Sequence, residues 1–133
     1  MDQPATDALR QAMPFAAALG LEVMTSGPDE VRVRMGWAEE RCTGDGILHG
    51  GAVMALADTT GASCAFLNLP EGSLGTATIE SKTNFLRAVR SGWVEAHSRP
   101  LHVGRTVIVV ETDVADDTGR LSARVTQTQA VLR

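Results

Sequence analysis

The sequence predicts an α+β fold in which one long helix packs against a curved antiparallel β-sheet. Residues 52–69 form a nearly unbroken apolar segment, which corresponds to a helix of about 27 Å. After Pro70 the chain reads as strands separated by short turns, and strands joined in this way pair antiparallel. A helix with so little polar surface is usually buried, so we expect the strands to wrap around it.

The composition is that of one globular domain, 1–133, with a helical segment over 1–20 at its N-terminus. Hydrophobic residues make up 44% of the chain and charged residues 21%, values that are ordinary for a protein with a single core. The net charge is −4 and no basic block occurs, which argues against a nucleic-acid partner. We see no signal peptide and no apolar stretch of about 20 residues, so we expect a cytoplasmic protein without membrane contact.

The N-terminal part of the chain predicts one interrupted helix and two strands. Residues 4–19 are rich in Ala, Leu and Met, and Pro14 is expected to kink this helix or split it in two. A short strand is expected over 21–25. Apolar and polar residues alternate over 31–37, which indicates a strand with one buried face. The glycine-containing stretch 41–46 is expected to be a loop.

The long helix is expected to pack through one set of side chains into the core. This set consists of Val53, Leu56, Thr60, Cys64 and Leu67. Gly61 is unfavourable in a helix by about 1 kcal/mol relative to alanine, so it indicates close approach of another backbone or a ligand. Cys42 and Cys64 lack metal-site spacing, and we expect no bound metal.

The C-terminal half is expected to contain four strands that follow one another as hairpins. They span 76–86, 93–101, 105–115 and 121–132. The loop 116–119, Asp-Asp-Thr-Gly, is a strong hairpin signal. In the last strand the face that carries Val125 turns polar at Gln127.

One segment resembles the signature of a known family. It reads Gly46-x-x-His49-Gly50-Gly51-x-x-x-x-Leu56-x-Asp58. This pattern is similar to that of hotdog-fold acyl-CoA thioesterases of the phenylacetate-pathway (PaaI-like) group. Further matching features occur in the expected order at Phe85-Leu86, Gly92-x-Val94, Val103-Gly104-Arg105 and Asp117-x-Gly119-Arg120-Leu121. The resemblance implies a hotdog fold, hydrolysis of an acyl- or aryl-CoA to the free acid and CoA, and no cofactor.

The resemblance also implies roles for residues on the long helix. The first turn of a helix carries unpaired N–H groups and a partial positive charge. The Gly50 N–H would stabilise the oxyanion, Gly51 would admit the substrate, and His49 would orient the turn and polarise the carbonyl. Asp58, from the neighbouring subunit, would act as general base or as nucleophile. A charge in so apolar a helix costs free energy unless it has a partner or a function.

Further site residues are implied by their positions relative to the family pattern. Thr78, or alternatively Thr76, occupies the position of a Ser or Thr that orients the water. Thr43 stands six residues before the histidine, where the family often has an Asn that helps to bind the thioester or position water. A hydroxyl is shorter than an amide, so the geometry at this position differs from the family pattern.

Basic side chains near the strand starts are the candidates for the CoA phosphates, namely Arg105, Arg87 and Lys82. The resemblance implies a homo-oligomer, a dimer or a dimer of dimers, and a free sheet edge gives a physical reason for one. Two alternatives are a non-catalytic acyl-CoA-binding or sensing protein, which Thr43 favours, and a hotdog hydratase or dehydratase. The second alternative fits less well because such enzymes usually place a catalytic His beside the carboxylate at the helix.

Overall fold

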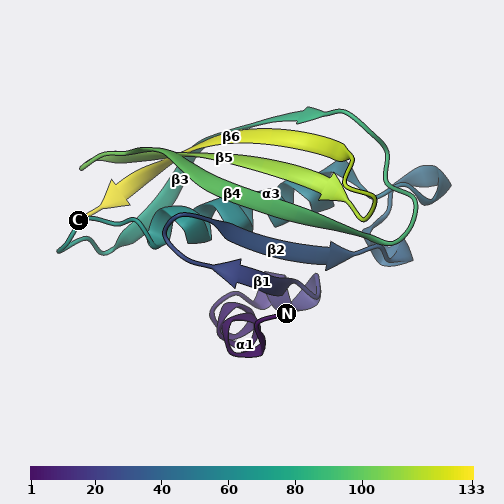
Figure 1. The fold of residues 1–133 in the computed structure, drawn as a ribbon, viewed down its shortest axis with the longest axis horizontal. Helices are drawn as coiled ribbons and strands as arrows, with labels where there is room; N and C mark the ends of the chain where they lie inside the picture. The colour runs from purple at the N-terminus through teal and green to yellow at the C-terminus, as the bar shows by residue number, and fades with distance from the viewer.

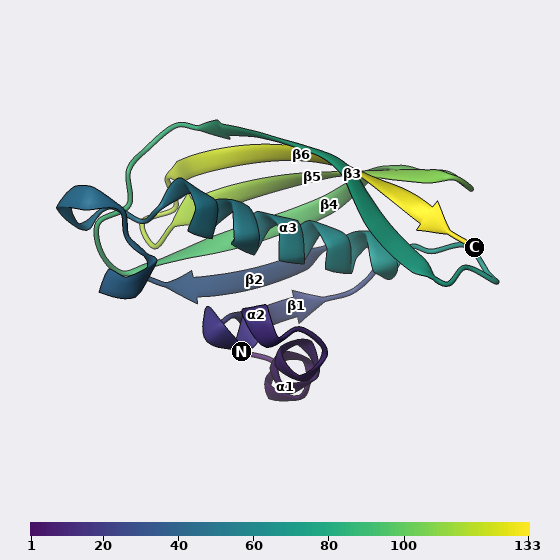
Figure 2. The same cartoon turned by 180° about the vertical axis from the view of Figure 1, so that it is seen from behind.

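The structure, a computed structural model of residues 1–133, consists of one long helix lying across a six-stranded antiparallel sheet (Figures 1 and 2). The helix is α3 (Gly50–Phe66). The strands are β1 (Glu22–Ser26), β2 (Val31–Gly36), β3 (Gly75–Phe85), β4 (Trp93–Val103), β5 (Val107–Asp116) and β6 (Leu121–Leu132). This arrangement confirms the predicted α+β fold and the predicted wrapping of a sheet around a helix.

Two short helices cover one edge of the sheet. They are α1 (Gln3–Ala12) and α2 (Pro14–Ala18), so Pro14 splits the N-terminal helix as predicted. The N–H of Asp2 donates to the carbonyl of Val23 in β1 at 2.8 Å, and Arg10 Nε donates to the carbonyl of Leu21 at 2.9 Å. The edge of β1 is therefore covered by the chain itself, and α1 lies beside β1 in both views.

The pairing of β3 differs from the prediction. The strand order is β1-β2-β4-β5-β6-β3, so β3 pairs with β6 and not with β4. The hairpin prediction is correct for β4–β5 and β5–β6 and wrong for β3–β4. The segment after Phe85 instead crosses from one edge of the sheet to its interior. Because of this crossover, β2 and β3 border α3 from opposite sides.

The core lies between α3 and the inward-facing residues of β2, β4, β5 and β6. Apolar side chains on alternate positions of these strands are fully buried, including Val33, Val94, Val110 and Val125. The helix presents four of its five predicted core residues to them: Val53, Leu56, Thr60 and Cys64.

Leu67 is an exception to the predicted core, because 43% of its surface is exposed. The helix begins two residues earlier than predicted, at Gly50, and ends three residues earlier, at Phe66, so Leu67 is its C-cap residue.

The opposite side of α3 is not covered by its own chain, and Figure 2 shows it open toward the viewer. Met54 is 40% exposed and Phe66 59% on this helix, and Ile79 on the neighbouring edge strand β3 is 62% exposed. Asp58 is exposed here as well, so the expectation of a helix buried on all sides is wrong for one chain.

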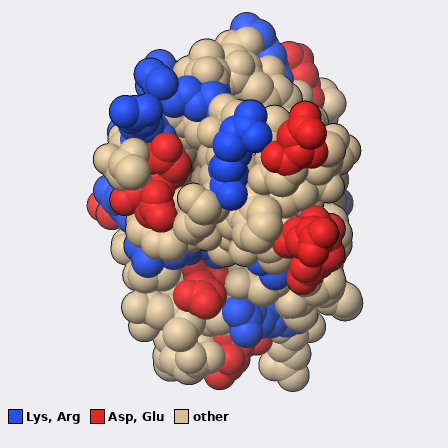
Figure 3. Space-filling view, turned by 90° about the vertical axis from the view of Figure 1, so that its right-hand side faces the viewer, with Lys and Arg blue, Asp and Glu red and all other residues tan.

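The charged side chains are distributed over the surface. Figure 3 shows basic and acidic groups interspersed on the end of the molecule that carries the β5–β6 hairpin. On the sheet, Arg34 pairs with Glu95 at 3.1 Å and stacks 3.6 Å from the ring centre of Trp93. No helix is long and apolar enough to cross a membrane.

Candidate active site

The start of α3 presents one unpaired backbone donor. His49 is the N-cap residue with extended backbone angles, and its Nδ1 accepts the Gly51 N–H at 2.7 Å. The Gly50 N–H makes no hydrogen bond within the chain. Because the helix N-terminus also carries a partial positive charge, Gly50 offers a donor to a negatively charged oxygen.

His49 and Gly51 contact each other at the start of α3, and their predicted roles toward the substrate stay predictions. The imidazole orients the turn by holding the Gly51 N–H. A Cβ at position 51 would lie 2.9 Å from His49 Nδ1, so the missing side chain makes room for this ring. The capping histidine therefore gives one structural reason for glycine at position 51.

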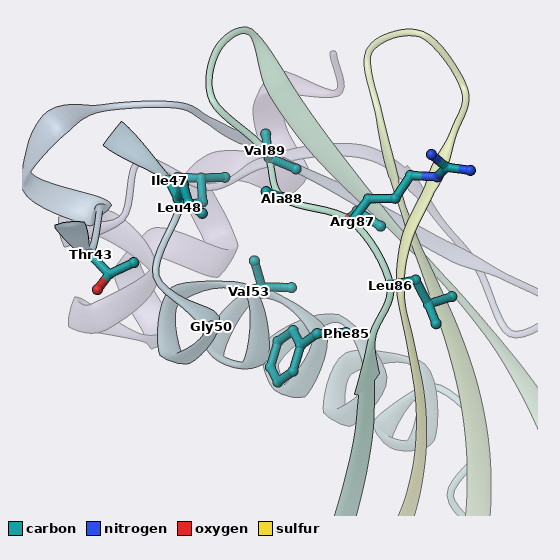
Figure 4. Close-up of a pocket in the computed structure, with 11 residues that line it drawn as sticks. Thr43, Ile47, Leu48, Gly50, Val53, Phe85, Leu86, Arg87, Ala88 and Val89 are labelled. Carbon is teal, nitrogen blue, oxygen red and sulfur yellow. The ribbon is translucent and has the colours of Figure 1, made fainter. Parts of the chain in front are cut away.

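A pocket of about 400 Å³ opens in front of Gly50 (Figure 4). Val53 from α3 and Phe85 from the end of β3 form its apolar wall. A Cβ at position 50 would lie 3.1 Å from the Phe85 ring, which leaves space for glycine and little more. Thr43 lies on the rim, and its hydroxyl makes no hydrogen bond within the chain. The pocket thus brings together Thr43 and the free donor of Gly50.

Asp58 is held by side chains of two strands that meet at the edge of the sheet. Gln127 Nε2 of β6 donates to Asp58 Oδ1 at 2.7 Å, and the Thr78 hydroxyl of β3 donates to the same oxygen at 3.1 Å. Gln129 Nε2 in turn donates to Thr78 Oγ1 at 2.7 Å. These contacts fix Oδ1, whereas Oδ2 accepts no hydrogen bond within the chain. One oxygen of the carboxylate is anchored and the other is available.

Gly61 explains how Gln127 reaches the carboxylate. Both residues are fully buried, and a Cβ at position 61 would overlap Gln127 Oε1. The close approach predicted for Gly61 therefore exists, but its partner is a side chain of the sheet and not a backbone or a ligand. The side chains of Gln127 and Gln129 form hydrogen bonds only through Nε2. The Oε1 atom of each is buried without a partner.

Gln127 and Gln129 are the residues of this network that sequence reasoning missed as site residues. The sequence does show that the buried face of β6 becomes polar at Gln127, and this change indicates a polar partner for that face. The sequence does not indicate which helix residue this face meets, because that depends on the pairing of β6 with β3. Thr78 contacts Asp58 through its hydroxyl, and its predicted role in orienting water stays a prediction. Thr76 lies two residues earlier on β3 and does not contact the carboxylate.

The donor and the carboxylate lie too far apart to act on one carbonyl within a single chain. Gly50 and Asp58 are both on α3 and are separated by eight positions. At a rise of about 1.5 Å per residue, this places them about 12 Å apart along the helix axis. A site that uses both groups therefore needs the Asp58 of a second copy beside each Gly50.

The predicted basic residues do not cluster within one chain. The Arg87 N–H donates to the carbonyl of Ser122 at the start of β6, and its guanidinium points away from the pocket in Figure 4. Arg105 lies at the other end of β6, where its carbonyl accepts from Arg133 at 3.0 Å. The length of β6 separates them by about 30 Å. Lys82 is exposed in the middle of β3.

The thiol of Cys64 lies in the core, on the buried side of α3. Burial raises the pKa of the Cys64 thiol to about 11, so it remains a protonated core side chain at neutral pH. No group of three or more His, Cys, Asp or Glu side chains is arranged to hold a metal ion.

A curved six-stranded antiparallel sheet wrapped around one long helix is the architecture of the hotdog fold. The model of the thioesterase superfamily matches residues 45–123, which contain Gly50 and Asp58. The chain belongs to this superfamily and is a thioester hydrolase, as the sequence predicts.

Individual proteins are similar over most of the chain. Thioesterase HI1161 of Haemophilus influenzae is 31% identical, with a TM-score of 0.84 over 90% of this chain and 82% of that chain. The 1,4-dihydroxy-2-naphthoyl-CoA hydrolase of Escherichia coli K12 is 34% identical over 87 residues, 65% of this chain and 63% of that protein. The E. coli PaaI protein has the same fold, with a TM-score of 0.85 over 96% of this chain and 90% of that chain at 20% identity.

Proposed function

We propose that the protein hydrolyses an acyl-CoA thioester at a site formed by Gly50 of one subunit and Asp58 of another. The observation that carries the proposal is the pair of unsatisfied groups on α3, the Gly50 N–H and Asp58 Oδ2. The Gly50 N–H can stabilise the oxyanion that develops on the thioester carbonyl. Asp58 Oδ2 can take a proton from the attacking water or attack the carbonyl carbon itself. Each group is rigidly supported, and neither has another partner within the chain.

In the proposed reaction, the thioester oxygen accepts the Gly50 N–H. Asp58 Oδ2 takes a proton from water while the water oxygen bonds to the carbonyl carbon. The carbon–sulfur bond then breaks, the free acid forms, and the CoA thiolate takes up the proton that Asp58 removed from water, which restores the carboxylate. The alternative is direct attack by Oδ2, which gives a mixed anhydride that water then hydrolyses. Single turnover in ¹⁸O-water followed by mass spectrometry of the protein detects the anhydride route when water attacks the aspartyl carbon, because general-base hydrolysis never leaves ¹⁸O in Asp58.

The free edge of the sheet supports assembly through β3. This strand has 11 residues and no neighbour on its outer side, and it exposes Ile79. A long edge strand with free backbone N–H and C=O groups is a site of pairing with another chain. Two antiparallel copies of β3 would place the uncovered sides of two α3 helices together and bring each Asp58 toward the other Gly50.

The pocket beside Gly50 supports a path for the CoA moiety. Its wall is apolar, which suits the pantetheine arm, and Arg87 stands at its outer rim for a phosphate. Arg105 is too remote to serve the same pocket within one chain. Arg105 could contact a CoA bound at this pocket only from another subunit. Lys82 lies on β3, near the proposed subunit boundary.

Hybrid dimers test the divided site. We expect Asp58→Asn and Gly50→Pro each to abolish thiol release from acyl-CoA. When the two variants are mixed by refolding, each heterodimer has one intact site. Random mixing would therefore restore about one quarter of the wild-type rate in a symmetric dimer. No restoration, with hybrid formation verified by native mass spectrometry, would contradict a site shared between subunits.

A further inference from the structure

A second cavity lies under α1, away from the pocket at Gly50. Its volume is about 580 Å³, within the range of about 300–1,000 Å³ that is typical of small-molecule sites. It is bounded by α1, by β1 and β2, and by the second half of α3. Figure 2 shows these elements around the end of α3 that points away from His49.

The lining of this cavity is apolar and carries no charge. Most of its side chains are hydrophobic, including Leu9, Val33 and Phe66. The hydroxyl of Ser63 is already used, because it donates to the Thr59 carbonyl at 2.8 Å. On α1 the small side chains of Ala5 and Ala8 face the space, which keeps it open.

The cavity begins next to Asp58. Ala62 lies one helical turn beyond Asp58 on the same face of α3, where side chains are about 6 Å apart. Thr76 lines the cavity too, and it points to the same side of β3 as Thr78, about 7 Å along the strand. A group attached to a carbonyl carbon beside Asp58 can therefore enter the cavity without passing a charged side chain.

We propose that this cavity takes the acyl group and selects a saturated chain of medium length. The inference rests on the proposed function, because it assumes that the thioester lies beside Asp58. Each methylene that leaves water for an apolar wall contributes about fourfold in binding. The lining offers no cationic side chain to a terminal carboxylate, so dicarboxylic acyl groups are expected to bind less well than monocarboxylic ones. Thr76, rather than orienting water, is part of the wall at the entrance.

The test is a series of CoA thioesters assayed by thiol release. We expect kcat/KM to rise at least tenfold from butyryl-CoA to octanoyl- or decanoyl-CoA, and to fall at least tenfold from hexanoyl-CoA to adipoyl-CoA. A flat series, or a preference for 4-hydroxybenzoyl-CoA over octanoyl-CoA, overturns the acyl assignment while hydrolysis remains. If no thioester is hydrolysed in an Asp58-dependent way, the proposed function fails as well.

Two variants of α1 locate the acyl group. Ala8→Phe fills the cavity, so its loss of kcat/KM should increase with chain length and reach about tenfold for decanoyl-CoA. Gln11→Phe places the same ring on the exposed outer side of α1 and should change no substrate more than twofold. Phe66→Ala enlarges the cavity and should move the optimum to longer chains. Equal losses for all substrates in a folded Ala8→Phe, checked by circular dichroism, would exclude the cavity as the acyl site.

Discussion

The two centres on α3 are built in different ways, although eight positions separate them. At the start of the helix, His49, Gly50 and Gly51 are adjacent in sequence, and the donor is a backbone group. In the middle of the helix, Asp58 depends on Gln127, which is 69 residues away, and on the hydroxyl of Thr78. The first centre is local, whereas the second exists only once β3 and β6 have paired.

This difference determines which substitutions can damage each centre. A backbone donor is lost only through a change that removes the N–H or the helix turn itself. A carboxylate that is positioned by the sheet can be displaced by a residue that never contacts substrate. We therefore expect the donor to be sensitive at one position and the carboxylate to be sensitive at several.

Among the substitutions proposed, replacing Gly50 with proline should lower kcat the most, because it removes the backbone N–H. Proline is tolerated at the first position of a helix and lacks an N–H, and the extended backbone of His49 is compatible with a following proline. Gly50→Ala adds a Cβ against Phe85 but keeps the N–H, so it is the matched control. We expect kcat for Gly50→Pro to be about 10²–10³-fold below that of Gly50→Ala. Equal activity of the two variants would show that the N–H is not used.

Gly61→Ala should damage the carboxylate without touching substrate. The new Cβ overlaps Gln127 Oε1, so the amide must move away from Asp58. We expect a loss of about 1–3 kcal/mol in the free energy of unfolding, from denaturant titration, and a drop of at least tenfold in kcat. In the double variant Gly61→Ala/Gln127→Ala the overlap is gone, so stability should recover while activity stays low. Recovery of both would mean that Gln127 does not position Asp58.

Thr78→Val should have a smaller effect, because it removes one of two donors to Oδ1. Valine keeps the shape of the side chain, and Gln127 still holds the carboxylate. We expect kcat to fall about tenfold with little change in KM. Thr83→Val in the same strand is the control, because the Thr83 hydroxyl is buried without a partner and its loss should leave kcat unchanged. Equal kcat for the two variants would leave Thr78 without a role at the carboxylate.

The same contrast explains which features could be predicted from the sequence. The turn at His49 and the helix behind it are encoded by consecutive residues, and the expected helix differs from the observed one by a few terminal residues. Thr78 was predicted through the family pattern. The polar end of β6 was visible at Gln127, yet its contact with Asp58 depends on the place of β6 in the sheet.

The error in the sheet has the same physical origin. A strand followed by a turn-like segment can fold back on itself or cross to another strand, and local residues do not distinguish the two outcomes. Pairing β3 with β4 would have removed β3 from β6, and with it the contact between Thr78 and Gln129. The pairing of strands distant in sequence is therefore the reason why the predicted strand order was wrong and why Gln127 and Gln129 were missed as site residues.

The smallest expected effect lies on the sheet, away from both centres. His97 Nε2 lies 2.7 Å from Glu30 Oε2, and this hydrogen bond, aided by Arg32, holds the pKa of Glu30 below its usual value. A carboxyl whose pKa is lower in the folded state adds stability above its unfolded pKa of about 4.3, and this contribution is lost as the pH falls through the folded pKa. Glu30→Gln removes this dependence, so its Tm should decline less steeply than that of the wild type below that pH. Its kcat at neutral pH should remain within twofold of wild type, because nothing connects this pair to Asp58. A larger loss of activity would mean that β2 and β4 also help to position Asp58. The centre at Asp58 would then depend on the whole sheet and not only on β3 and β6.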